Sequence, residues 1–273
     1  MTITVSSRTL AITMLTMLAV LIGSIGVAGA QARADHTTAA GATEPEGALP
    51  DHTADVRRLF TELTKEWPAN RTINVVVHGH SVPSGYHQTP QVKPFESYPF
   101  MVYQGLNARF PTAVMNTITT SIGGENSVQG AARFRRDVLR HQPDLLLIDY
   151  AINDTNLPLD EVERAWRDMI TVARRNHVPL VLLTPTGTVP HDLSNPDDPL
   201  SIRAELIRRL GGDYDIPVAD VSARWQEALD SGTPKESLLS HYYHPNKAGH
   251  ELAAAEILRT IDAMRAEAGQ SSP

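Results

Sequence analysis

The sequence predicts a three-layer α/β/α protein with a five-stranded parallel sheet, and two patterns lead to this prediction. Short runs of apolar and β-branched residues, such as 145–148, have the composition of strands buried on both faces. Longer segments between these runs repeat apolar residues at three- and four-residue intervals, as one face of a helix does. Strands that alternate with helices form parallel sheets through right-handed crossovers. The 273 residues show no internal repeat and no second domain.

The elements follow in order along the chain. We expect a first helix from Ala54, with Val56, Leu59, Phe60 and Leu63 on one face, that ends before Pro68. Strands are expected at 73–79, 113–117, 144–150, 179–184 and 217–220. The connecting and closing helices are expected at 99–107, 127–141, 159–176, 201–210 and 247–266.

The N-terminal residues have the pattern of an export signal. An apolar run from Leu10 ends in Ala28, Gly29 and Ala30, which predicts a signal peptide at 1–30, cleaved after Ala30, and a secreted or extracytoplasmic protein. The alternative is an uncleaved membrane anchor, because the apolar run approaches the length that spans a bilayer. The protein would be held at a membrane only if this segment stays uncleaved. Residues 31–53 are predicted to be a disordered linker, 54–268 the catalytic domain and 269–273 a flexible tail.

The composition of the chain argues against several kinds of stabilising link and binding partner. The chain has no cysteine, so neither disulfides nor cysteine-ligated zinc can stabilise it. The formal net charge of −7 argues against nucleic acid or an anionic membrane surface as a partner. No feature of the sequence indicates an oligomeric state.

Polar residues gather where the predicted strands end. In an open parallel sheet the loops at the carboxyl ends of the strands share one edge, where ligands bind. The loops expected at this edge are 79–81, 121–127, 151–154 and the segment 241–246 before the last helix. Each alone consists of ordinary turn and helix-cap residues, but together they supply a serine, a histidine, glycines and an asparagine. We therefore expect a single site at this edge.

These four segments resemble the four sequence blocks of the SGNH/GDSL hydrolases, in family order: Gly79 to Ser81, Ser121 to Ser127, Asn153 with Asp154, and His241 to Pro245. The middle portion is similar to the thioesterase and lysophospholipase branch. The resemblance implies a flavodoxin-like fold and a carboxylic ester hydrolase without cofactor or metal. It implies that Ser81 is the nucleophile and His244 its general base. The oxyanion hole would be formed by the Ser81 amide, the Gly124 amide and the Asn153 side chain.

These residue types suit acyl transfer. A serine hydroxyl attacks an acyl carbon when an imidazole accepts its proton and later returns it to the leaving group. Donors already directed at the oxyanion stabilise the tetrahedral intermediate, and removing one donor costs on the order of 10² to 10³ in rate.

Two positions depart from the family pattern. His80 replaces the aspartate before the nucleophile, and His241 replaces the acid three residues before the base. In serine hydrolases loss of that acid's charge costs on the order of 10⁴ in rate. Three interpretations remain open. A backbone carbonyl or His241 holds the Nδ1 hydrogen of His244; or a carboxylate from elsewhere replaces the acid, the candidates being Asp154, Asp230 and Glu236; or the site is degenerate.

The histidines permit one further alternative. His78, His80, His241 and His244 lie on loops expected to meet, and neutral imidazoles are zinc ligands. Their spacing matches no metal motif, so we expect none.

The predicted substrate is a small-molecule or carbohydrate ester with a short acyl group, especially acetyl. Aromatic residues at 83–99, together with Tyr242 and Tyr243, offer rings that stack on sugars or pack the loops. The sequence contains no broad apolar lid for long chains. A lysophospholipase or thioesterase and a catalytically inactive extracellular binding module are the alternatives.

Overall fold

The computed structural model describes residues 49–269 and contains one five-stranded sheet in which every pairing is parallel. The strand order is β2-β1-β3-β4-β5. The strands are β1 (Thr72–Gly79), β2 (Val114–Thr119), β3 (Leu145–Asp149), β4 (Leu180–Leu183) and β5 (Val218–Ala219). The predicted fold class and all five predicted strands are confirmed.

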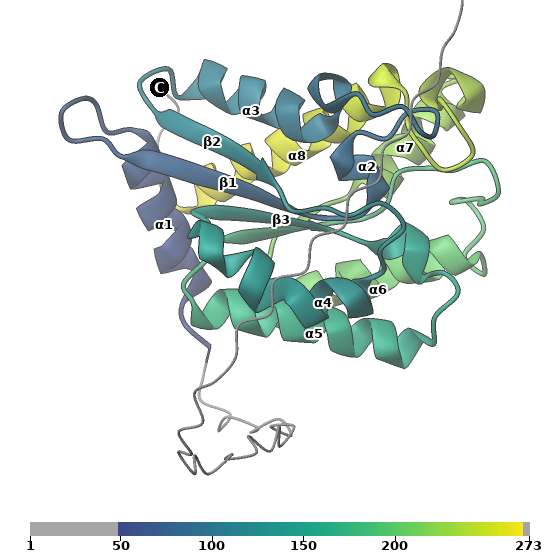
Figure 1. The fold of residues 1–273 in the computed structure, drawn as a ribbon, viewed down its shortest axis with the longest axis horizontal. Coiled ribbons are helices and arrows are strands. Elements are labelled where there is room, and N and C mark those ends of the chain that lie inside the picture. The colour runs from purple at the N-terminus through teal and green to yellow at the C-terminus, as the bar shows by residue number, and fades with distance from the viewer. Residues whose placement is uncertain (1–48, 270–273) are drawn as a thin grey trace, which may run out of the picture. The chain divides into compact units, whose positions relative to one another are not determined.

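Helices cover both faces of the sheet (Figure 1), with α3, α7 and α8 on one side and α4, α5 and α6 on the other. The helices are α1 (His52–Leu63), α2 (Ser81–Ser84), α3 (Tyr98–Arg109), α4 (Ser127–Asp137), α5 (Leu159–Arg175), α6 (Pro199–Tyr214), α7 (Val221–Asp230) and α8 (Lys247–Glu267). The chain crosses from β1 to β2 over one face and returns from β2 to β3 over the other. The strand order therefore reverses beside β1, and such a switch point opens a crevice at the carboxyl ends of the strands.

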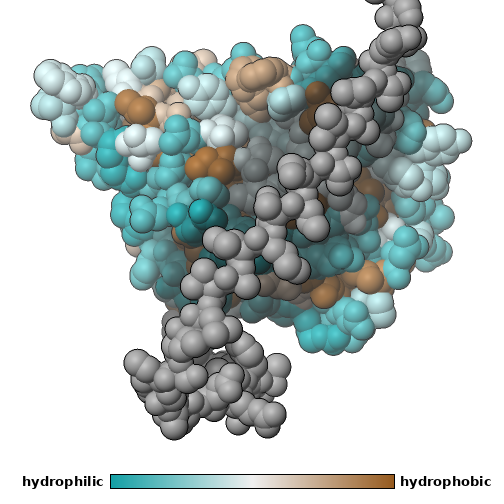
Figure 2. Space-filling view, viewed as in Figure 1, coloured by the Kyte–Doolittle hydropathy of each residue, from teal (hydrophilic) through white to brown (hydrophobic). Residues whose placement is uncertain are grey.

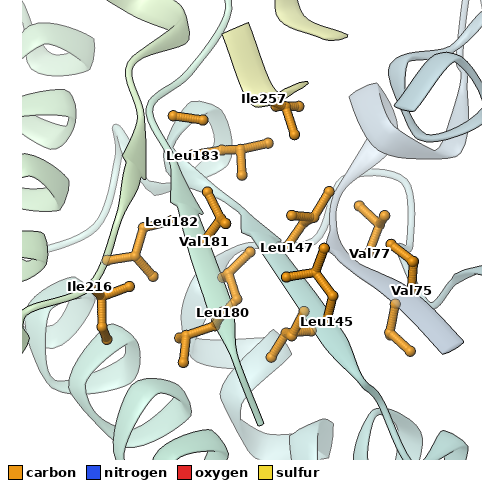
Figure 3. Close-up of a cluster of buried hydrophobic side chains, with 14 of the residues drawn as sticks. Val75, Val77, Leu145, Leu147, Leu180, Val181, Leu182, Leu183, Ile216 and Ile257 are labelled. Carbon is orange, nitrogen blue, oxygen red and sulfur yellow. The ribbon is translucent and has the colours of Figure 1, made fainter. Parts of the chain in front are cut away.

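The core forms because the central strands carry apolar side chains on both faces. All five residues of β3 are buried, and in β1 the buried run extends from Val75 to Gly79. Figure 3 shows side chains of β1, β3 and β4 in adjacent rows, with Ile257 of α8 directed toward Leu183. Burying a side chain of this size contributes about 1.5 to 3 kcal/mol. This packing gives the loops at the strand ends a rigid base.

Three helices differ most from the prediction. Helix α1 begins at His52, within the predicted linker, because the Asp51 side chain accepts a hydrogen bond from the Thr53 amide and caps the helix. Helix α4 ends at Asp137, and a short 3-10 turn covers 139–141. Helix α7 was not predicted: its buried residues are Val221, Ser222 and Trp225, too few to give a clear apolar repeat.

No helix within residues 49–269 is long and apolar enough to cross a membrane. The face seen in Figure 2 is mainly hydrophilic, with its hydrophobic residues in small separate groups. The predicted signal peptide at 1–30, most of the predicted linker and the last four residues lie outside the described part of the chain.

Candidate active site

Ser81 lies at the switch point of the sheet, immediately after β1. Gly79 ends the strand, His80 caps the following turn, and Ser81 is the first residue of α2. Gly79 pairs with Asp149 of β3, and a Cβ atom on Gly79 would lie 2.3 Å from the Asp149 carbonyl oxygen. Only glycine permits this close approach, which brings the end of β1 and its serine against β3.

The Ser81 hydroxyl contacts the imidazole of His244. Ser81 Oγ lies 3.0 Å from His244 Nε2, although the two residues are 163 positions apart. His244 is 8% exposed and precedes α8, whose N-cap Asn246 accepts a hydrogen bond from the Gly249 amide. Burial lowers the pKa of His244 below 6.5, and the neighbouring histidines act in the same direction. The ring is therefore neutral near pH 7 and able to accept a proton.

The other ring nitrogen of His244 faces a backbone carbonyl. His244 Nδ1 lies 3.1 Å from the His87 oxygen, and donation to this carbonyl leaves Nε2 free to accept from Ser81. The Ser240 hydroxyl lies 3.1 Å from the same oxygen, and the His87 amide donates to the Gln91 carbonyl. The loop after α2 is thereby joined to the loop before α8. The structure thus has a serine, a histidine and a carbonyl in the order of a triad.

His241 does not occupy the position of a triad acid. Its side chain is exposed, and its ring centroid lies 5.8 Å from that of His244. The recorded hydrogen bonds between the two residues join backbone atoms, at 3.4 Å. His241 is therefore a neighbour of the base and not the partner of its Nδ1 atom.

The three candidate carboxylates lie elsewhere. Asp154 is buried and accepts from the Ser127 amide at 2.7 Å and from Trp166 Nε1 at 3.3 Å, so it joins α4 to α5. Burial raises its pKa. Asp230 accepts from Gln226 at the exposed end of α7, and Glu236 is exposed in the turn 235–238. None of the hydrogen bonds or ion pairs among residues 49–269 connects these carboxylates to His244.

Gly124, in the loop after β2, and Asn153, in the turn after β3, both follow the carboxyl ends of strands. Gly124 has φ +79°, a conformation that favours glycine, and it is exposed. Asn153 follows β3, and its Nδ2 atom donates to the Glu125 carbonyl at 2.9 Å. None of the hydrogen bonds among residues 49–269 uses the Ser81 or Gly124 amide as a donor.

A buried polar network supports this loop, and it was not predicted from the sequence. Glu125 accepts a two-pronged ion pair from Arg133 of α4, with Nε to Oε1 at 2.6 Å. The Tyr150 hydroxyl donates to Glu125 Oε2 at 2.8 Å and lies 3.1 Å from His78 Nε2. His78 Nδ1 lies 2.9 Å from the Thr120 hydroxyl. Residues of β1, α4 and the end of β3 thus fix the residue that follows Gly124.

Tyr86 lies between the glycine loop and the base. Its ring centroid is 5.8 Å from that of His244, and a Cβ atom on Gly123 would lie 3.0 Å from its ring. The Tyr86 ring therefore fills space beside the His244 imidazole.

The histidines do not form a metal centre in this arrangement. His78 lies inside the network beneath the glycine loop, whereas His241 lies exposed at the rim. In the described part of the chain no group of three or more His, Cys, Asp or Glu side chains is arranged to hold a metal ion.

A cavity of about 440 Å³ lies far from Ser81 along the sheet. Its lining includes His52, the first residue of α1. It also includes Asp215 and Pro217, which come before β5 and so lie at the opposite end of the parallel strands. It therefore does not belong to the site at the switch point.

A serine hydroxyl 3.0 Å from a buried imidazole, at the carboxyl edge of a parallel sheet covered by helices on both faces, is an arrangement that an acyl hydrolase can use. Residues 77–252 match the model of the GDSL-like lipase/acylhydrolase family. The chain belongs to this family, and it is a carboxylic ester hydrolase.

Individual relatives are more distant. An acetylxylan esterase of Geobacillus stearothermophilus is 25% identical over 172 residues, which cover 57% of this chain and 76% of the relative. A crystal structure of a catalytic mutant of an acetylxylan esterase from the same organism aligns with a TM-score of 0.61 and 21% identity, over 69% of this chain and 94% of that one. A two-domain esterase active on acetylated mannans aligns with a TM-score of 0.65 and 23% identity, over 80% of this chain and 56% of that one.

Proposed function

We propose that this protein is an exported serine esterase that removes short acyl groups, especially acetyl groups, from carbohydrates. The observation that carries the proposal is the distance of 3.0 Å between Ser81 Oγ and His244 Nε2. A neutral imidazole at this distance is a general base for the hydroxyl. Its other nitrogen donates to the His87 carbonyl, which fixes the required tautomer without a carboxylate.

The reaction follows from this geometry in two steps. Ser81 Oγ bonds to the acyl carbon while His244 Nε2 takes its proton, and the same proton then goes to the departing alcohol as the ester bond breaks. The tetrahedral oxyanion accepts hydrogen bonds from the amides of Ser81 and Gly124 and from the Asn153 side chain. A water molecule, deprotonated by His244 Nε2, then attacks the acyl carbon. The bond to Ser81 Oγ breaks, His244 returns the proton to Ser81 Oγ, and the acid is released.

The substrate class rests on the surroundings of the base and on the relatives. Tyr86 narrows the space beside His244, which favours a short acyl group. Tyr242 and Tyr243, 59% and 44% exposed, follow His241 at the rim and offer rings for a sugar. The similar acetylxylan esterase and the esterase active on acetylated mannans support a carbohydrate as the alcohol part. Export is proposed from the signal-like residues 1–30, and sequencing the N-terminus of the secreted protein tests it.

Replacing the nucleophile tests the mechanism. Ser81→Ala is expected to abolish hydrolysis of p-nitrophenyl acetate and covalent labelling by a fluorophosphonate. The matched control is Ser84→Ala, on the same short helix, whose hydroxyl donates to the His80 carbonyl and does not contact His244. The control should keep both activities. Hydrolysis by the Ser81 variant at the wild-type rate would disprove the proposal.

A substrate panel separates the alternatives. Acetylated xylan and mannan oligosaccharides should be hydrolysed faster than p-nitrophenyl esters of long acyl chains. Faster hydrolysis of long-chain esters or of lysophospholipids would indicate the lysophospholipase or thioesterase alternative. Folded wild-type protein that neither reacts with the fluorophosphonate nor hydrolyses any ester would be the binding module.

A further inference from the structure

The residue before Ser81 is a buried histidine where the family pattern has an aspartate. His80 is the N-cap of α2, and its Nδ1 atom accepts a hydrogen bond from the Val82 amide at 3.3 Å. The His80 side chain is completely buried. Because a ring nitrogen that accepts carries no hydrogen, the proton of the neutral ring is on Nε2.

That proton faces one carboxylate. His80 Nε2 lies 3.5 Å from Asp149 Oδ1, which is longer than an ordinary hydrogen bond. Within residues 49–269 His80 Nε2 has no hydrogen-bond partner, so this carboxylate is a polar neighbour and not a bonded acceptor. Asp149 is itself buried at the end of β3, where it pairs with Gly79 in the sheet register.

The second oxygen of Asp149 has a hydrogen-bond donor. The Tyr98 hydroxyl donates to Asp149 Oδ2 at 2.9 Å. Burial and the neighbouring carboxylate raise the pKa of Tyr98 well above 10, so the phenol stays protonated and remains a donor. Tyr98 is the first residue of α3. Polar groups therefore follow one another from α3 through the end of β3 to the turn that carries Ser81, and the 3.5 Å separation between His80 and Asp149 is the longest step.

We propose that His80 and Asp149 together perform the positioning task of the aspartate expected before the nucleophile. The carboxylate stands at the end of β3 instead of in the turn, and the imidazole connects it to the Val82 amide. The pair fixes the turn of α2 and with it the direction of the Ser81 hydroxyl. Neither side chain touches the reacting atoms, so both are positioning residues. The inference rests on the proposed role of Ser81 as nucleophile.

Exchanging the two side-chain types tests the pair. His80→Asp places a second carboxylate beside Asp149 in a buried space, where two like charges repel each other. Asp149→Asn removes the acceptor charge that faces His80. In the double variant the introduced carboxylate accepts from the Val82 amide, and the introduced carboxamide donates to that carboxylate. The pair is then restored with its members exchanged.

The expected result is a rescue of kcat. Each single variant should lose kcat with little change in KM, and the double variant should exceed the product of the two single effects by ~10-fold, a coupling typical of residues in contact. Rates of fluorophosphonate labelling at Ser81 should follow the same order. The control is His80→Asp combined with Asp220→Asn, because Asp220 caps α7 and pairs with Arg208 away from the site. These two changes should act independently.

The outcomes separate this inference from the proposed function. Independent effects of His80→Asp and Asp149→Asn, or an unchanged kcat in either single variant, would overturn the inference while labelling of wild-type Ser81 persists. Wild-type protein that is folded but not labelled at Ser81 would overturn the proposed function itself. Circular dichroism and the unfolding midpoint of each variant show whether a loss of kcat reflects a loss of fold.

Discussion

The two halves of the candidate active site are held in place by different means. On the oxyanion side, a buried ion pair between Glu125 and Arg133, extended by Tyr150, fixes the residue next to Gly124. On the base side, His244 is held by the neutral His87 carbonyl on a surface loop. Removing one charge of the Glu125–Arg133 pair should therefore lower the free energy of unfolding. The base side should instead respond through the pKa of one histidine.

The largest expected effect lies on the oxyanion side. Glu125→Gln removes the carboxylate and leaves Arg133, 10% exposed, with a longer ion pair of 3.6 Å to Asp137. Breaking a buried pair in this way costs about 3 to 5 kcal/mol of unfolding free energy. Urea denaturation monitored by tryptophan fluorescence measures it. The matched control is Glu205→Gln, whose carboxylate is 74% exposed in its pair with Arg208, and the expected cost there is below about 1 kcal/mol. Equal costs in both variants would show that the buried pair does not support the loop.

The next effect concerns rate and not stability. Asn153→Ala removes the side-chain donor of the proposed oxyanion hole, so kcat should fall on the order of 10² to 10³ with little change in KM. The same variant loses one hydrogen bond to the Glu125 carbonyl, about 1 kcal/mol of stability. Steady-state kinetics on an acetyl ester separate the two quantities. A loss of stability with kcat unchanged would assign Asn153 to the loop alone.

On the base side, one substitution should raise kcat. His241→Asp places a carboxylate at the sequence position of the family's acid, on an exposed residue whose ring lies 5.8 Å from that of His244. A negative charge near His244 raises its pKa and stabilises the imidazolium that forms during proton transfer. We expect kcat to rise by several-fold, less than the order of 10⁴ attributed to the acid in triads, because the carbonyl already fixes the tautomer. His241→Asn is the control without charge. If both variants behave alike, the introduced carboxylate does not reach the base.

The same contrast explains what the sequence could predict. The five strands were predictable because their apolar runs directly reflect burial, as in 145–148, whereas α7 buries too few residues for a repeat. Ser81 and His244 were predictable because their residue types carry the chemistry. The partner of His244 Nδ1 could not be predicted, because every residue has a backbone carbonyl and the sequence does not distinguish one from another. The network of Glu125, Arg133 and Tyr150 joins three segments through charges that, in a sequence, resemble surface residues.

The smallest expected effect is the position of one inflection in the pH profile of the unmodified enzyme. Burial lowers the pKa of His244, and the ring must be neutral to accept the Ser81 proton. Therefore kcat/KM should remain high as the pH falls past 6.5 and decline only through the lowered pKa. Released acetate should be measured, so that a titrating chromophore does not distort the curve. His241→Asp should move the inflection upward. An inflection above pH 6.5 in the unmodified enzyme would mean that a negative charge already stabilises the protonated base.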